Sequence, residues 1–365
     1  MPARAPTYGT YLQIDRLLGA QSPPDYAALL PDDPPDRRTR ELLHHDELLF
    51  IVVHQAFELW FKLVLHGLSR ARDLLGRVSP GERPDVVAEV HVPEISAALG
   101  RVNEIFRIAV DQFRVIETMP TLSFLAFREA ITPASGFQSV QFRELEILVG
   151  AEEPRLAASR GVFAALLTPG EADRIRRRLD ETTLKAALLD WLGRTPIERA
   201  FPEFGREFVA AFDRYCDDQE AAHSANPYAT DEERAAARFR IAGLRAEARA
   251  YVLGGDPATR RANQAFLFIT TYREEPLLRW PALLLDGLVE FEQGFRAFRF
   301  RHARMVERMI GARTGTGGSA GVSYLDQTTG YKIFGNLLEA RSFLLERRRL
   351  PELAFPEVFR FRFDA

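Results

Sequence analysis

Residues 281–313 read PALLLDGLVEFEQGFRAFRFRHARMVERMIGAR, and their apolar side chains recur with the period of an α-helix. At about 100° per residue they form one continuous stripe along the helix. The stripe comprises Leu284, Leu288, Phe291, Phe295, Phe298, His302, Met305, Val306 and Met309. The segment therefore predicts a long core helix, in which the imidazole of His302 points where a core residue should.

A second long helix is predicted over residues 47–75, with Asp46 as its N-cap. His54 shares a face of this helix with apolar side chains, and Glu58 follows one turn later on the same side. The apolar members of the face are Phe50, Ile51, Phe57, Phe61, Leu65 and Leu68. Two distant helices thus each carry one histidine on an otherwise apolar stripe, which favours a shared cavity.

The helical period dominates the rest of the chain and predicts an all-α fold. Further helices are expected over residues 8–18, 93–119, 122–131, 140–149, 231–252, 265–272 and about 328–345. No internal repeat and no linker rich in Pro, Gly or Ser divides the chain. We therefore predict one domain over residues 1–365, with residues 150–260 as a variable helical insertion.

Composition narrows the class of protein. The chain has 365 residues, 46% of them hydrophobic and 27% charged, with a net charge of −3. This balance gives no electrostatic reason to expect a nucleic acid or an anionic membrane as partner. The single cysteine, Cys216, excludes an internal disulfide and a CxxC metal site. No apolar stretch free of charge is long enough to cross a bilayer, and residues 1–6 lack a signal-peptide core, so a cytoplasmic location is expected.

The two histidines each allow two interpretations. His302 is either a buried histidine held by a hydrogen bond or an axial haem ligand, with the flanking Arg299 and Arg301 near the haem propionates. His54 is either half of a core pair with Glu58 or the single hydrogen-bonding group in a pocket wall. The pattern alone does not decide between them.

Arg128 lies on a short helix beside Phe124, Leu125 and Ile131. A guanidinium among apolar groups is costly unless it holds an anion, so it forms either an internal salt bridge or a clamp on a substrate carboxylate. The glycine-rich residues 311–321 lack the ending of a phosphate-binding loop. They fit a lid that closes over a ligand, or a plain surface loop.

These residues also carry a resemblance to the tryptophan 2,3-dioxygenase family, in blocks that occur in the family's order. The blocks are residues 8–15 (YGTYLQID), 45–60 (HDELLFIVVHQAFELW), 127–128 (FR), 133–139 (PASGFQS), 272–276 (YREEP), 301–302 (RH), 305–308 (MVER) and 314–319 (TGTGGS).

The resemblance implies a haem b enzyme, with His302 as the iron ligand and His54 as the distal histidine that meets the indole N–H. It implies a further set of substrate-binding residues: Phe50, Arg128, Ile131, Thr316, Tyr8, Tyr11 and Leu12. The implied lining of the haem pocket is Ser135, Gly136, Phe124 and Phe142. The family is a homotetramer in which the segment around Tyr8 to Leu12 reaches a neighbouring subunit's site.

The implied reaction is cleavage of the indole C2–C3 bond of L-tryptophan by O2, which gives N-formylkynurenine. Three alternatives stay open: a haem mono-oxygenase or related dioxygenase acting on an indole derivative, a non-catalytic haem-binding protein or sensor, and a helical scaffold without haem. Phe124 and Ala320 stand where the family often has Tyr and Ser, which bears on the exact indole substrate.

Overall fold

The computed structural model describes residues 5–28, 38–76, 89–151, 167–318, 320–353 and 355–359, and it is built from helices. Over these ranges no strand occurs, and Pro24 and Thr39 form an isolated β-bridge. The predicted all-α fold is confirmed.

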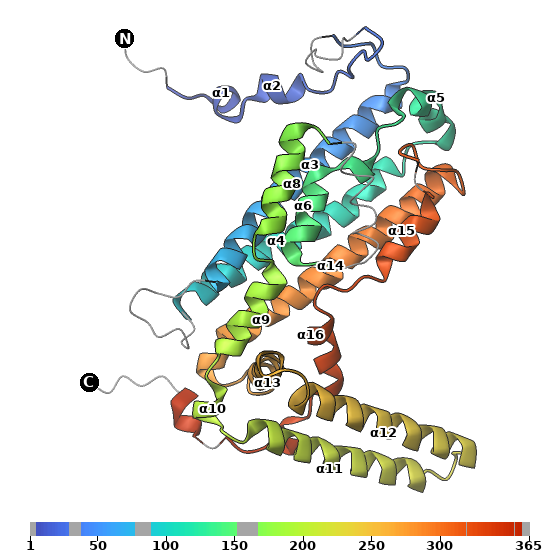
Figure 1. The fold of residues 1–365 in the computed structure, drawn as a ribbon. Helices are drawn as coiled ribbons and strands as arrows, with labels where there is room; N and C mark the ends of the chain where they lie inside the picture. Colours follow the sequence, from blue (N-terminus) through green and yellow to red (C-terminus); the bar gives the residue numbers. More distant parts are fainter. Residues whose placement is uncertain are drawn as a thin grey trace. The chain divides into compact units, whose positions relative to one another are not determined.

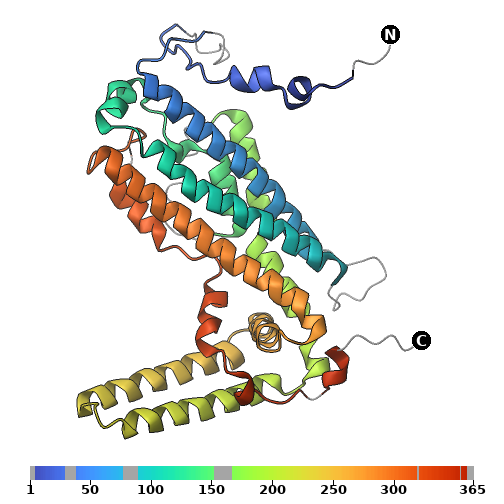
Figure 2. The same ribbon diagram turned by 180° about the vertical axis from the view of Figure 1, so that it is seen from behind.

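Figure 1 and Figure 2 show the helices from opposite sides. In chain order the α-helices are α1 (Tyr8–Leu12), α2 (Ile14–Leu18), α3 (His45–Leu75), α4 (Val92–Ile116), α5 (Thr121–Ile131), α6 (Val140–Val149), α8 (Pro169–Asp180), α9 (Leu184–Arg194), α10 (Ile197–Ala200), α11 (Phe204–Ala225), α12 (Asp231–Leu253), α13 (Pro257–Thr271), α14 (Arg279–Ile310), α15 (Val322–Thr329) and α16 (Gly335–Ala340).

The chain divides into two compact units. The first unit comprises Met1–Phe61, Ile108–Ser139 and Ala297–Thr329, and the second comprises Lys62–Arg107, Val140–Arg296 and Gly330–Ala365. The long helices α3, α4 and α14 each contribute to both. The prediction of a single domain with an insertion at residues 150–260 stays a prediction.

The core of the first unit is a cluster of phenylalanine rings supplied by three helices. Phe57 on α3, Phe113 on α4 and Phe298 on α14 have ring centroids 4.9–5.5 Å apart in every pairing. All three are at most 7% exposed. Rings at this separation attract one another beyond their burial, so the cluster fixes how the three helices pack at this level.

The second unit contains the elements of the predicted insertion. Its helices α11 and α12 run side by side as an antiparallel pair (Figure 1 and Figure 2). Ion pairs join them, with Arg245 2.7 Å from Asp217 and Arg249 2.6 Å from Asp213. α12 begins in a capping box, where the Thr230 hydroxyl accepts from the Glu233 N–H.

Two sequence predictions are wrong in detail. Residues 8–18 form two helices rather than one, because Gln13 adopts a left-handed conformation (φ 52°) that ends α1. The helix expected over residues 328–345 is replaced by the end of α15 and the short α16. The Glu292 carboxylate accepts hydrogen bonds from the N–H groups of Ile333 and Phe334, at 2.9 and 2.8 Å. In a continuous helix these two N–H groups would donate to carbonyls of the same helix.

Helix α3 is long and apolar enough, by composition alone, to cross a membrane. The same composition suits a core helix, and Leu68 and Ala71 on α3 have no exposed surface.

Candidate functional site

His54 lies on α3 with its hydrogen-bonding pattern fixed. Its Nδ1 is 2.7 Å from the backbone oxygen of Phe50. A carbonyl can only accept, so Nδ1 carries the proton and Nε2 of the neutral ring keeps its lone pair. Burial lowers the pKa of the His54 imidazole, against smaller opposing effects of the Phe50 carbonyl and the Glu58 carboxylate. At neutral pH the ring is therefore an uncharged acceptor.

His302 lies on α14, on the stripe that the sequence predicts. Its stripe neighbours Phe298, Met305 and Met309 are buried, whereas the histidine keeps part of its surface accessible. The imidazole is stacked with the Phe113 ring of α4 at 5.9 Å, with an angle of 29° between the planes. One face of the ring is thus held by an aromatic neighbour.

The two histidines belong to one aromatic cluster. The His54 ring is 6.4 Å from the Phe57 ring, Phe57 is 4.9 Å from Phe113, and Phe113 is 5.9 Å from His302. All four rings lie in the first unit. Two imidazoles some 250 positions apart in the sequence are therefore brought into one interior rather than into separate cores.

Arg128 lies on α5, and its guanidinium makes only some of the hydrogen bonds that it could make. Its Nη2 donates to the backbone oxygen of Thr314, while its Nε is buried without a hydrogen-bond partner. Among the described residues no carboxylate pairs with it, so the internal salt bridge allowed by the sequence is not found there. A buried cationic donor in this condition suits an anionic ligand.

The glycine-rich loop lies against the turn that follows α5. The Thr316 hydroxyl donates to the Ala134 carbonyl at 2.7 Å. A Cβ added at Gly317 would lie 2.7 Å from Ser135 Cβ, so only glycine permits this approach. The loop and the Pro-Ala-Ser-Gly turn therefore form one wall, next to Arg128. Ser319 lies outside the described residues.

Two other predicted residues, Phe50 and Phe124, lie beside His54, and Ser135 and Ile131 lie in and before the turn after α5. The Phe50 ring is 4.0 Å from the His54 ring and 5.8 Å from the ring of Phe124, which is buried. The Ser135 hydroxyl accepts from the Phe137 N–H and caps the short helix that begins at Gly136. Ser135 and Ile131 are partly exposed.

Four predicted residues are not brought to this cluster. Tyr8, Tyr11 and Leu12 are 79%, 77% and 43% exposed, and neither α1 nor α2 buries a side chain. Phe142 belongs to the second unit, where its ring is 5.6 Å from that of Phe295.

Sequence reasoning missed several residues that hold the site. The Gln112 amide of α4 donates to the Val53 carbonyl at 2.8 Å and accepts from the Trp60 indole at 3.2 Å. Arg301, expected near a propionate, is paired with Glu117 at 2.6 Å. The local pattern could not reveal these partners, because each is set by how α3, α4 and α14 pack.

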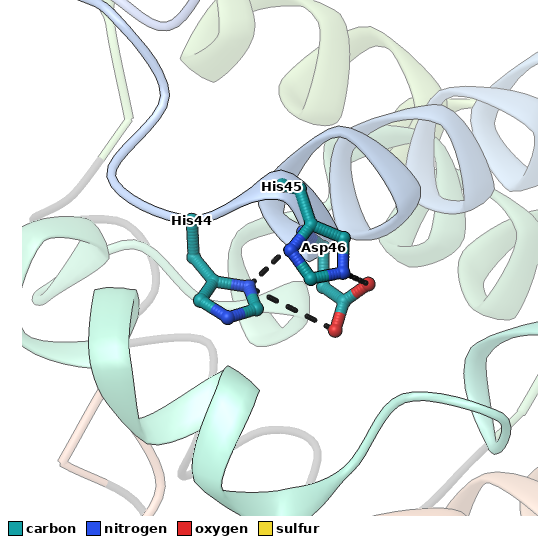
Figure 3. Close-up of side chains that lie close together, drawn as sticks. All are labelled: His44, His45 and Asp46. Atoms are coloured by element: carbon teal, nitrogen blue, oxygen red, sulfur yellow. Dashed lines mark hydrogen bonds and ion pairs between the residues drawn. The ribbon is translucent and has the colours of Figure 1, made fainter.

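The start of α3 also gathers three side chains that could reach one cation: His44, His45 and Asp46 (Figure 3). Their arrangement has a simpler cause. The His44 Nδ1 accepts the Asp46 N–H at 3.1 Å, and the Asp46 carboxylate lies in the first helical turn. Both features stabilise a helix start, whose positive end disfavours a cation.

Comparisons with known proteins match most of the chain to one family. The sequence model of a family described as tryptophan 2,3-dioxygenase matches residues 3–344. The tryptophan 2,3-dioxygenase of Sorangium cellulosum (strain So ce56) is 38% identical, over 98% of this chain and 88% of the relative. Tryptophan 2,3-dioxygenase 2 of Ralstonia nicotianae is 40% identical over 85% of this chain and 88% of the relative. The Xenopus laevis tryptophan 2,3-dioxygenase is 33% identical over 98% of this chain and 86% of the relative.

Proposed function

The chain belongs to the tryptophan 2,3-dioxygenase family, and we propose that it cleaves the indole C2–C3 bond of L-tryptophan with O2, using haem b, to give N-formylkynurenine. The observation that carries this proposal is the single aromatic cluster in which His54 and His302 both lie. Arg128 and the glycine-rich loop belong to the same unit.

The donor groups of the first unit suit a haem. His302 offers an imidazole on a helix whose neighbouring side chains are apolar, and an imidazole nitrogen is a common axial ligand of haem iron. The Phe113 ring stacked on it restricts its rotation. When bound, haem supplies the activation of O2, and the protein supplies position and polarity. We propose that Phe124, Ser135 and Gly136 line the haem; Phe142, which the resemblance also implies, belongs to the second unit.

His54 orients the substrate in this proposal. Because its Nδ1–H is used by the Phe50 carbonyl, its Nε2 is the atom that accepts the indole N–H. The Phe50 ring, 4.0 Å from the imidazole, forms the adjoining wall against the flat indole. Together they fix the plane of the ring to be cleaved, which is the main catalytic contribution open to the protein.

Arg128 and Thr316 recognise the amino-acid part of the substrate. The partnerless Nε of Arg128 supports a charge-assisted bond to the α-carboxylate. The Thr316 hydroxyl, on the loop beside it, can accept from the ammonium group while it donates to the Ala134 carbonyl, and it must release that carbonyl to donate to the carboxylate. Ile131 adds an apolar contact, and the closed loop excludes water from the reacting atoms.

The exposed N-terminal helices are assigned to assembly. We propose that Tyr8, Tyr11 and Leu12 complete the substrate site of a neighbouring copy in a homotetramer, since their side chains find little cover on their own chain. We also propose that the protein is cytoplasmic.

One experiment tests the function. Reduced protein is incubated aerobically with L-tryptophan, and the absorbance of N-formylkynurenine is followed. A product containing both oxygen atoms of O2, by mass, supports the proposal, whereas one added oxygen indicates a mono-oxygenase. A haem spectrum without turnover indicates a haem-binding protein, and purified protein without a Soret band indicates a helical scaffold.

A further inference from the structure

We propose that one turn of α4, residues 112–117, sets the separation of His54 and His302 by holding α3 with one face and α14 with another. Gln112, Phe113 and Glu117 are the positioning residues. The inference rests on the proposed haem function, because the separation matters only if the two imidazoles serve one cofactor.

Gln112 holds the helix that carries His54. Its amide donates to the carbonyl of Val53, the residue before His54, and accepts from the Trp60 indole N–H. Both ends of the amide are therefore used, one on each side of His54 along α3. A side-chain amide bonded at both ends fixes the rotation and the height of its partner helix.

Phe113 and Glu117 hold the helix that carries His302. The Phe113 ring stacks on the imidazole at 5.9 Å. One turn further along α4, the Glu117 carboxylate pairs at 2.6 Å with Arg301, the residue before His302. The Glu117 side chain is 11% exposed, so its charge is costly unless this pair is kept.

The helical period separates these two sets of contacts. On α4, Gln112 and Glu117 are five positions apart and so point about 140° away from each other, while Phe113 contacts both Phe57 of α3 and His302 of α14. A helix is stiff over one turn. The side chains on its two faces therefore fix how α3 and α14 are rotated and shifted along their axes, in addition to the direct contact of Phe57 with Phe298, and so set the separation of the two imidazoles.

The two faces can be tested separately by substitution. Glu117→Gln keeps the side chain's shape but removes the charge that holds Arg301. Partners bonded directly to a ligating histidine alter metal affinity by about 10–100-fold, and Glu117 acts one residue removed, through Arg301, so the lower end of this range applies. We expect the resonance Raman iron–histidine band of the ferrous protein to shift, and haem loss to apomyoglobin to quicken at least about tenfold. The swapped pair Glu117→Arg with Arg301→Glu should restore both values.

Gln112→Met keeps a similar length but loses both hydrogen bonds. It should weaken L-tryptophan binding, measured by optical titration, and leave the iron–histidine band unchanged, because α14 keeps its own contacts with α4. A shift of the band in this variant as large as that of Glu117→Gln would overturn the assignment of two separate faces.

The chain offers a control pair between the same two helices, more exposed than Arg301 and Glu117. Arg107 and Glu290 also pair α4 with α14, in the second unit and far along both helices from residues 117 and 301. Glu290→Gln removes a charge from the same helix pair and should leave the band and the haem-loss rate unchanged. The proposal is overturned if Glu117→Gln has no effect, or if Glu290→Gln has the same effect. Failure of the haem function is distinguishable, since the unsubstituted protein would then show no Soret band.

Discussion

At the scale of single residues, the bond between His54 Nδ1 and the Phe50 carbonyl decides which nitrogen is left to face a substrate in the proposed site. The same burial that leaves Nε2 as an acceptor lowers the pKa of the ring. In the folded protein the ring therefore resists protonation more than it does in the unfolded chain, where the pKa of a histidine is about 6.5. The contribution of His54 to stability is complete above that pH and is lost as the pH falls toward the folded-state pKa.

This shift predicts the pH dependence of turnover. The value of kcat/KM for L-tryptophan should stay level as the pH falls through about 6.5, the ordinary histidine range, and decline only below it. The decline reflects protonation of Nε2, which abolishes its role as acceptor. Steady-state kinetics from pH 5 to 8 provide the measurement, with His54→Ala as the comparison. A decline centred at or above the ordinary histidine pKa would contradict the assignment.

Arg128 allows a second prediction at this scale. Arg128→Leu removes a buried charged partner of the substrate, which costs about 2–5 kcal/mol. The KM for L-tryptophan should therefore rise at least about 30-fold, since each 1.4 kcal/mol is a factor of about ten. Tryptamine, which lacks the carboxylate, serves as the control substrate, and its KM should change little on the same substitution. Equal losses for both substrates would mean that Arg128 does not read the carboxylate.

At the scale of elements, the glycine-rich loop is held by close contact with the turn after α5. Gly317→Ala would place a methyl group 2.7 Å from Ser135 Cβ, so the loop must move away from the turn. A displaced substrate wall of this kind costs roughly tenfold to a hundredfold in kcat/KM. Haem content, measured by the pyridine haemochrome spectrum, should stay normal. Unchanged kinetics would show that the loop does not close over the substrate.

Most helices could be predicted from the sequence because their signals are local. The stripe through His302 predicted α14, and the His54 face predicted α3, each to within about three residues. The α6 helix was predicted with its observed bounds, Val140–Val149. The apolar period is a property of neighbouring positions, so it can be predicted without the fold. The predicted N-cap is wrong, because α3 begins at His45 and Asp46 lies in its first turn.

The remaining features depend on residues far apart in the sequence. The break between α15 and α16, inside the predicted final helix, is decided by Glu292, which lies 41 positions before Ile333 and accepts its N–H. The pair of Arg301 with Glu117 likewise joins residues 184 positions apart. Residue types and their faces could be predicted, but their partners could not, because helix packing selects them.

At the scale of the whole molecule, the N-terminal helices predict that activity depends on assembly. Deletion of residues 1–18 should leave the haem content normal and abolish turnover. Co-expression of this variant with His302→Ala copies should restore part of the activity, because an arm from the second reaches a haem in the first. Activity in the deletion variant alone, or none in the mixture, would place the arm outside the substrate site.

His302→Gly tests most directly whether His302 would hold the haem in the proposed site that His54 shares. Purified without added imidazole, this variant should lack the Soret band of the unsubstituted protein. Reconstitution with haem in the presence of imidazole should restore the band, since the free ligand can take the place of the missing side chain. A full haem complement and an unchanged Soret band in His302→Gly without imidazole would contradict the account.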